Sequence, residues 1–247
     1  MRLPSSLRVG PRSIRSMAVL SGFIALGLGA CSSNDNGGGG GGGGTSSFVG
    51  TVVGGANNDE SGSLTFDIAG TALAPPASIT TMSSATLTVT GTLTLVSPAA
   101  GTQALTGTYD DATNALDLSG GGYAFTGVFD GTTSRLDGTY NGANGAGLFV
   151  TALDLGNAVA FCGTFAGDDD GTWNFVVNGT ALSGSALTSS GNVAPLDGTV
   201  TAGAVSIVNP LDLQGPPLAT GTITGTSATG TWDDGQGSSG TWTGNGC

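Results

Sequence analysis

Few side chains in this chain of 247 residues could carry out chemistry, and their types exclude several mechanisms at once. The sequence has 17 acidic residues, 5 basic residues that are all arginines, 3 cysteines, and neither histidine nor lysine. Catalysis by a Ser-His-Asp or Cys-His pair, Schiff-base chemistry and histidine-ligated metal sites are therefore excluded. Only Arg135 among the arginines follows residue 30, so the rest of the chain is strongly acidic and should repel nucleic acid.

The densest group of acidic side chains is Asp168-Asp169-Asp170, which could bind Ca²⁺ through carboxylate oxygens. The surrounding sequence matches neither an EF-hand loop nor a nonapeptide calcium repeat. Aspartate also stabilises hairpin turns and keeps sheet edges soluble. We therefore interpret these three as turn residues and keep calcium binding as the alternative.

A glycosidase that works with two carboxylates needs both of them across one cleft. Glu60 is the only glutamate and is expected in a turn, and no aspartate stands within the apolar face of a predicted strand. The sequence therefore predicts a protein that is not an enzyme and uses no cofactor. An enzyme of an unrecognised type is kept as an alternative.

The three tryptophans, Trp173, Trp232 and Trp242, all lie in the last third of the chain and could stack on a sugar or on an apolar partner. Each stands two residues after a glycine, which places both residues on the same face of a strand. A chain so rich in glycine has little else to bury, so this pattern favours a core role. Direct ligand contact is the alternative.

The N-terminal segment carries the four other arginines and then an apolar run of 14 residues from Met17 to Ala30. Such a run is too short for a permanent membrane span but suits a signal peptide. It ends in Leu28-Gly29-Ala30-Cys31, which resembles the lipobox of bacterial lipoproteins. The resemblance implies that residues 1–30 are removed and that Cys31 receives fatty acyl chains such as palmitate, which anchor the protein to a membrane. An ordinary secretory signal is the alternative.

The resemblance also bears on location, because Ser32 rather than aspartate follows the cysteine and favours sorting to the outer membrane. We expect a cell-envelope protein, either periplasmic or exposed on the cell surface. Residues 31–47 are polar and include eight consecutive glycines at 37–44. A coil of this kind is a flexible tether that spans about 20–25 Å.

From residue 48 onward the sequence predicts an all-β protein made of short antiparallel strands. The dipeptide Gly-Thr occurs 16 times in the chain, often between an apolar residue and an aromatic or β-branched one. In such a strand the apolar residue, the glycine and the aromatic share one face, and the glycine leaves room for a large neighbour. Strand signals recur about every 10–12 residues, with turn residues between them, which is typical of an up-and-down meander.

The meander contains an internal repeat. The segments 48–52 and 62–66 match the segments 161–165 and 171–175 in their Gly-Thr and aromatic pattern. This indicates a duplication into units 48–157 and 158–247, each closing into a small eight-stranded barrel. One continuous larger barrel or sheet is the alternative. The pattern is similar to avidin and lipocalin-like barrels in architecture alone.

The same pattern places the two remaining cysteines. Cys162 is the second residue of the first strand of the second unit, and Cys247 ends the last strand. In a closed meander those two strands pair, and alternation turns Phe161 and Trp242 inward and both cysteines outward. Secretion supplies an oxidising compartment. We therefore predict a disulfide between Cys162 and Cys247, with free or intermolecular thiols as the alternative.

Three classes of function remain. The first is a non-enzymatic, lipid-anchored envelope protein whose barrel binds a protein, a glycan or a small lipophilic ligand, in addition to the membrane itself. The second is a structural envelope protein without a dedicated ligand, and the third is an unrecognised enzyme. An inward cavity lined by tryptophan and tyrosine would favour the first class, and a solidly packed barrel would favour the second.

Overall fold

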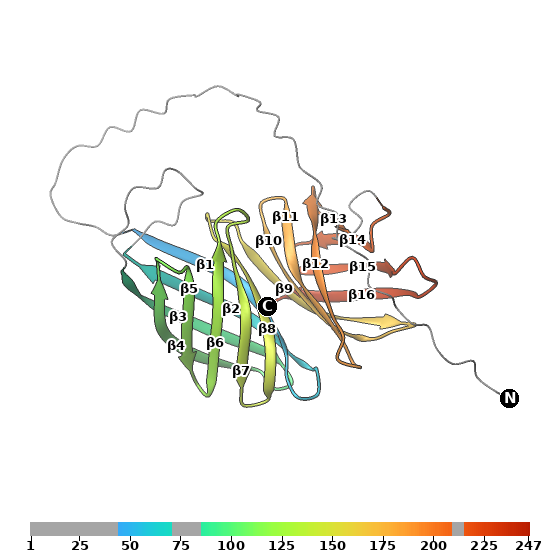
Figure 1. Ribbon diagram of the computed structural model, residues 1–247. Coiled ribbons are helices and arrows are strands. Elements are labelled where there is room, and N and C mark those ends of the chain that lie inside the picture. Colours follow the sequence, from blue (N-terminus) through green and yellow to red (C-terminus); the bar gives the residue numbers. More distant parts are fainter. Residues whose placement is uncertain (1–43, 71–84, 209–214) are drawn as a thin grey trace, which may run out of the picture. The chain divides into compact units, whose positions relative to one another are not determined.

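A computed structural model describes residues 44–70, 85–208 and 215–247 (Figure 1). The predicted signal peptide, Cys31 and the tether up to residue 43 lie outside the described residues. All regular structure within the described ranges is β-strand, as predicted. None of these ranges contains a helix that is long and apolar enough to cross a membrane.

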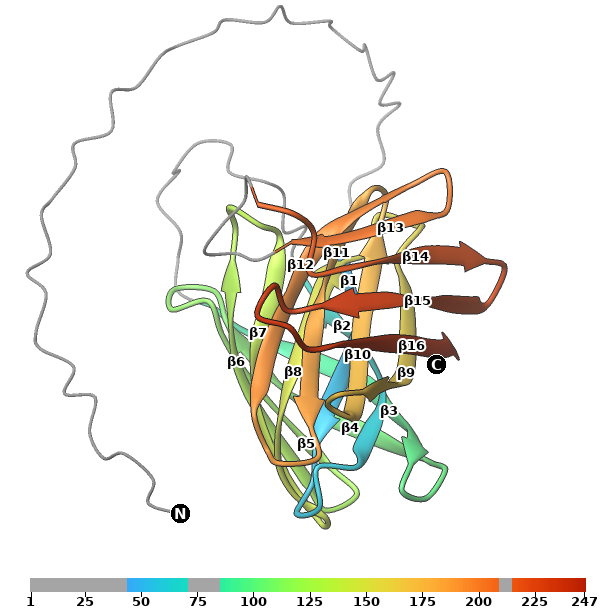
Figure 2. The ribbon, with the colours of Figure 1, turned by 90° about the vertical axis from the view of Figure 1, so that its right-hand side faces the viewer.

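The described residues form sixteen strands in chain order: β1 (Thr45–Gly54), β2 (Glu60–Ala69), β3 (Thr86–Ser97), β4 (Gly101–Asp110), β5 (Ala115–Gly120), β6 (Tyr123–Asp130), β7 (Arg135–Gly142), β8 (Gly145–Leu153), β9 (Val159–Gly167), β10 (Gly171–Asn178), β11 (Ala181–Thr188), β12 (Val193–Thr201), β13 (Ala204–Val208), β14 (Ala219–Thr224), β15 (Ser227–Asp233) and β16 (Ser239–Gly246). Strands β1–β8 close into one antiparallel barrel and β9–β16 into a second (Figure 1, Figure 2). The predicted pair of tandem eight-stranded barrels is confirmed, and a single continuous barrel is excluded.

The first barrel begins earlier than the sequence indicated. β1 starts at Thr45, so the last three residues of the predicted tether pair with β2 instead of forming coil. The Ser47 hydroxyl donates to an Asp67 carboxylate oxygen at 2.6 Å, which holds this end of β1 in place.

The two barrels repeat one pairing pattern in detail. Inward-facing glycines occur at equivalent registers: Gly50 and Gly163, Gly54 and Gly167, Gly62 and Gly171, Gly91 and Gly184, Gly107 and Gly198, Gly127 and Gly221, Gly138 and Gly230, Gly147 and Gly240. This agreement is what the predicted duplication requires.

The glycines have the packing role that the sequence predicted. A methyl group on Gly221 or Gly230 would overlap the ring of Trp242, and one on Gly163 would overlap the ring of Trp173. Large rings can therefore lie flat against the wall of a narrow barrel.

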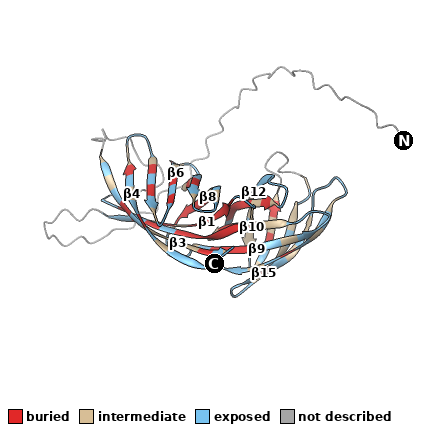
Figure 3. Cartoon of the chain, turned by 90° about the horizontal axis from the view of Figure 1, so that it is seen from below, coloured by how far each residue is buried: buried red, intermediate tan, exposed pale blue. Residues whose placement is uncertain are grey.

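The first barrel is filled by its own side chains. Its interior holds five fully buried aromatic residues: Phe48, Tyr109, Phe125, Tyr140 and Phe149. Burial continues on the outer face of some strands, because β1, β2 and β8 pack against β9, β10 and β11 (Figure 3). Outward-facing Val53 and Val176 are buried there for that reason.

Candidate ligand pocket in the second barrel

The second barrel has an open cavity of about 210 Å³ between its inward faces. All eight strands contribute a lining residue: Phe165, Trp173, Phe175, Ala186, Leu196, Ile207, Ala219, Trp232 and Trp242 are examples. A buried apolar cavity of about 150 Å³ already binds benzene. The space is therefore large enough for a single aromatic ring or a short alkyl chain.

All three tryptophans line this cavity. Trp173 and Trp242 are buried core residues that pack edge to face, with ring centroids 5.2 Å apart. Trp232 is half-buried and packs edge to face against Phe165 at 6.0 Å. The sequence left a core role and a ligand-contact role as alternatives for the tryptophans. The structure gives them a place in both the core and the wall of the cavity.

The indole N–H groups are all engaged by the barrel wall. Trp173 donates to the Thr164 carbonyl at 3.0 Å, and Trp242 donates to the Thr231 carbonyl at 3.2 Å. Trp232 donates to the Ala166 carbonyl at 3.4 Å. The rings consequently offer hydrocarbon and π surface to a ligand and no hydrogen-bond donor.

The origin of the cavity is visible when equivalent positions of the two barrels are compared. Leu118 pairs with Phe125 in the first barrel, and the equivalent Ile207 pairs with Ala219 in the second. Phe125 stacks on Tyr140 with centroids 5.3 Å apart, so its ring fills the space that Ala219 leaves open beside Trp232.

A second exchange enlarges the same space. Leu64 pairs with Leu93 in the first barrel, and the equivalent Trp173 pairs with Ala186 in the second. Leu93 is fully buried, whereas Ala186 lines the cavity. The sequence did not indicate either alanine as a cavity residue. An alanine indicates open space here only when it is compared with the larger residue at the equivalent position of the other barrel.

Glu60 lies buried at the end of the first barrel that corresponds to the open end of the cavity, and the sequence predicted its position wrongly. Glu60 was expected in a turn, but it is the first residue of β2 and is fully buried. Its carboxylate accepts hydrogen bonds from the Asn144 amide at 2.8 Å and the Tyr123 hydroxyl at 3.3 Å. Both donors bind Oε2 and offset part of the cost of removing the carboxylate from water, whereas Oε1 is buried without a hydrogen-bond partner among the described residues. Burial, aided by Glu60, raises the pKa of Tyr123.

The mouth of the cavity is acidic. Asp233 and Asp234 line it, and the turn that contains Asp168–Asp170 lies at the same end of the barrel. Asp168 accepts from the Ser239 amide at 2.9 Å, and Asp170 accepts from the Ser189 hydroxyl at 3.2 Å, so this turn is joined to the two neighbouring turns.

These contacts give the aspartates the turn role expected from the sequence. Within the part of the chain that the structure describes, no three metal-ligating side chains converge on one point. Asp234 is held similarly, because backbone N–H groups of Gln236 and Ser238 donate to it and lower its pKa.

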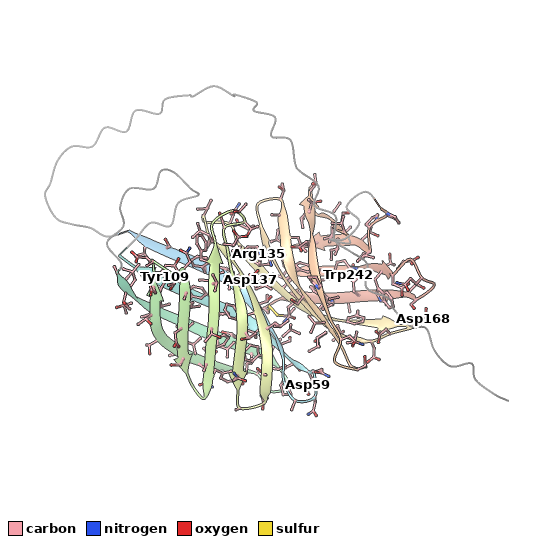
Figure 4. All side chains as sticks on the ribbon, in the orientation of Figure 1. Asp59, Tyr109, Arg135, Asp137, Asp168 and Trp242 are labelled. Atoms are coloured by element: carbon pink, nitrogen blue, oxygen red, sulfur yellow. A yellow bond between two sulfur atoms is a disulfide. The ribbon has the colours of Figure 1, made fainter. Side chains whose placement is uncertain are left out.

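Arg135 is the single basic side chain in the described ranges, and it lies away from the cavity lining (Figure 4). Its guanidinium pairs with Asp137 at 2.6 Å on its own strand and with Asp197 at 2.9 Å on β12. Burial raises the pKa of Asp137 and the neighbouring Arg135 opposes that shift. The pairing links the two barrels and leaves no positive charge at the mouth.

The predicted disulfide is present. Cys162 and Cys247 are bonded, with Cα atoms 5.6 Å apart. Cys162 faces out of the second barrel as predicted, but it is buried because the first barrel covers it. The carbonyl of Cys247 accepts a hydrogen bond from the Ser63 hydroxyl at 3.1 Å, so the bridge lies in the contact between barrels.

Comparisons with known proteins leave the chain without a family. No protein-family model matches it, and no curated protein matches it. One solved structure, described as a "putative AttH" from Nitrosomonas europaea, aligns over 81% of this chain and 91% of that chain at 10% identity, with a TM-score of 0.24. A similarity this low carries no argument about function.

Proposed function

We propose that this protein is a lipid-anchored protein of the cell envelope that binds a small apolar ligand in its second barrel and catalyses no reaction. The observation that carries the proposal is the apolar cavity, about 210 Å³ in volume and lined by all three tryptophans. The first barrel has the same fold but holds the fully buried Leu93 and Phe125 at the positions of Ala186 and Ala219, so the cavity depends on the side chains of this sequence and not on the architecture alone.

A structural protein without a ligand would gain stability from filling both barrels, because each buried apolar Å² contributes about 25 cal/mol. The chain fills one barrel with Phe125 and Leu93 and keeps Ala219 and Ala186 in the other. This contrast supports a ligand over a purely structural role.

The arrangement of carboxylates supports binding over catalysis. Asp233 and Asp234 at the mouth are exposed and accept hydrogen bonds from turn amides. The fully buried carboxylate, Glu60, belongs to the other barrel. The carboxylates among the described lining residues are therefore exposed turn residues, which supports binding over catalysis.

Anchoring through Cys31 rests on the Leu28-Gly29-Ala30-Cys31 sequence and the glycine-rich segment that follows. Mass spectrometry of the mature protein is expected to find an N-terminal Cys31 carrying acyl chains. The Cys31→Ala variant is expected to remain an unprocessed or soluble precursor. An unmodified N-terminus at another residue would overturn this part of the proposal.

Ligand binding is tested by titrating the purified full-length chain with toluene and following tryptophan fluorescence, since all three tryptophans line the cavity. We expect a saturable change that Ala219→Phe abolishes by filling the space. Val128→Phe adds the same ring to an exposed position of the first barrel and serves as the control. A response that is unsaturable, or identical in Ala219→Phe, would contradict a binding role.

A further inference from the structure

The cavity gives the polar part of a ligand only one place to lie. Its walls are apolar, and the three indole N–H groups already donate to backbone carbonyls. Among the described residues, Thr188, Asp233 and Asp234 are the polar ones that line it, and all three stand at the mouth end of the barrel. A polar group buried deeper would lose its water contacts without replacement, at a cost of several kcal/mol.

The charge at this mouth has one sign. Asp233 and Asp234 lie directly on the cavity, and their hydrogen bonds from turn amides use Oδ1 of each carboxylate. The Asp168–Asp170 turn adds three exposed carboxylates at the same end of the barrel. A charged group at the mouth therefore meets a negative potential.

No basic side chain in the described ranges offsets that potential. Arg135 is the single base after residue 30, and it is committed to Asp137 and Asp197. A fatty acid or another anion would place its charge beside carboxylates with no counter-ion. Anionic ligands are disfavoured for this reason.

The aromatic lining adds a second, independent attraction for a cation. Among the aromatic lining residues, Trp232 directly precedes Asp233 and packs against Phe165, so these two rings lie at the mouth end of the barrel, and Trp232 is half-buried there. The faces of such rings attract organic cations, and aromatic cages are a common way to bind quaternary ammonium groups. The rings at the mouth end and the carboxylates beside them thus favour the same class of molecule.

We infer that the ligand of the second barrel is a small organic cation, with an aromatic or short alkyl body in the cavity and an ammonium group at the mouth. This inference rests on the proposed ligand-binding function and adds the charge of the ligand to it.

Three probes of similar size and different charge test the inference on the purified full-length chain: 2-phenylethylammonium, 2-phenylethanol and phenylacetate. We expect the dissociation constant of the ammonium compound to be lower than that of the alcohol by a factor of up to about five, which is the contribution of an exposed ion pair. Phenylacetate should bind most weakly. High salt should reduce the preference for the cation.

Charge removal at the mouth should abolish the preference. The double variant Asp233→Asn with Asp234→Asn is expected to bind the ammonium compound and the alcohol equally. Asp110→Asn with Asp111→Asn removes the same charge from the end of β4 and the residue that follows it in the first barrel, and should retain the preference. Salt titration of the unaltered chain gives the same information if a variant does not fold.

The outcomes separate the two proposals. Equal binding of alcohol and ammonium, both lost in Ala219→Phe, would overturn the cationic ligand and leave the pocket function intact. Tightest binding of phenylacetate would do the same. Absence of binding by all three probes, or binding that Ala219→Phe does not affect, would overturn both proposals.

Discussion

At the scale of single residues, the contrast between Phe125 and Ala219 decides which barrel is solid and which is open. Phe125 is fully buried, with its ring 5.3 Å from Tyr140 and 5.6 Å from Phe149. Ala219 occupies the equivalent register beside the cavity.

We expect Phe125→Ala to lower the free energy of unfolding by about 3–5 kcal/mol, as is usual when a buried phenylalanine leaves a cavity. Ala219→Phe should be neutral or stabilising by up to about 2 kcal/mol, because it fills existing space. Urea unfolding of both variants measures the difference. A strong destabilisation by Ala219→Phe would show that the space beside Ala219 is already occupied.

The three tyrosines of the chain, Tyr109, Tyr123 and Tyr140, are all buried in the first barrel. Burial, with the charges of Asp111 and Asp110, raises the pKa of Tyr109 from 10.0 to about 12. Burial and Glu60 also raise the pKa values of Tyr123 and Tyr140.

A tyrosine with a raised folded-state pKa stabilises the fold below the unfolded-state pKa, and this stability is lost as the pH rises through the folded value. The first barrel is therefore expected to lose stability between about pH 10 and 12. Ultraviolet absorbance of tyrosinate, followed together with circular dichroism, should show ionisation coinciding with unfolding. Ionisation of all three near pH 10 in an intact fold would contradict the burial described.

At the scale of strands, alternation in the sequence was enough to predict the outward cysteines and the inward rings. Cys162 and Trp173 follow directly from the side on which their neighbouring glycines lie. Glu60 could not be placed in this way, because it begins its strand and its burial depends on Tyr123 and Asn144, which lie far along the chain. The cavity could not be predicted either. Its position depends on which residues of neighbouring strands lie opposite one another, and the sequence of one strand does not contain that information.

The disulfide joins the first and last strands of the second barrel across a sequence separation of 85 residues. Replacing both Cys162 and Cys247 by serine is expected to lower the free energy of unfolding by about 2–4 kcal/mol. The barrel should stay closed, because β9 and β16 also pair through their backbones. Urea unfolding with and without reductant measures the effect, and the double variant should not respond to reductant. A reductant-insensitive midpoint in the unaltered chain would contradict a stabilising bridge.

At the scale of the whole molecule, polar contacts join the two barrels. Asn174 is fully buried and donates to the Val52 carbonyl, and Asn178 donates to the Leu153 carbonyl at 2.8 Å. The Arg135–Asp197 ion pair adds a third contact. Removing one partner of a buried hydrogen bond costs about 1–3 kcal/mol, so these contacts can couple the stabilities of the barrels.

The distribution of aromatic residues lets this coupling be measured without labels, since tyrosine reports on the first barrel and tryptophan on the second. We expect tyrosine second-derivative absorbance and tryptophan fluorescence to give one shared urea midpoint, the mark of a cooperative unit. Asn174→Ala with Asn178→Ala should separate the two midpoints, because two carbonyls lose their donors. Asn141→Ala alters an exposed asparagine of β7 and should leave them together. Two separate midpoints in the unaltered chain would mean that each barrel unfolds independently, and that the contact between them contributes little to the stability of either.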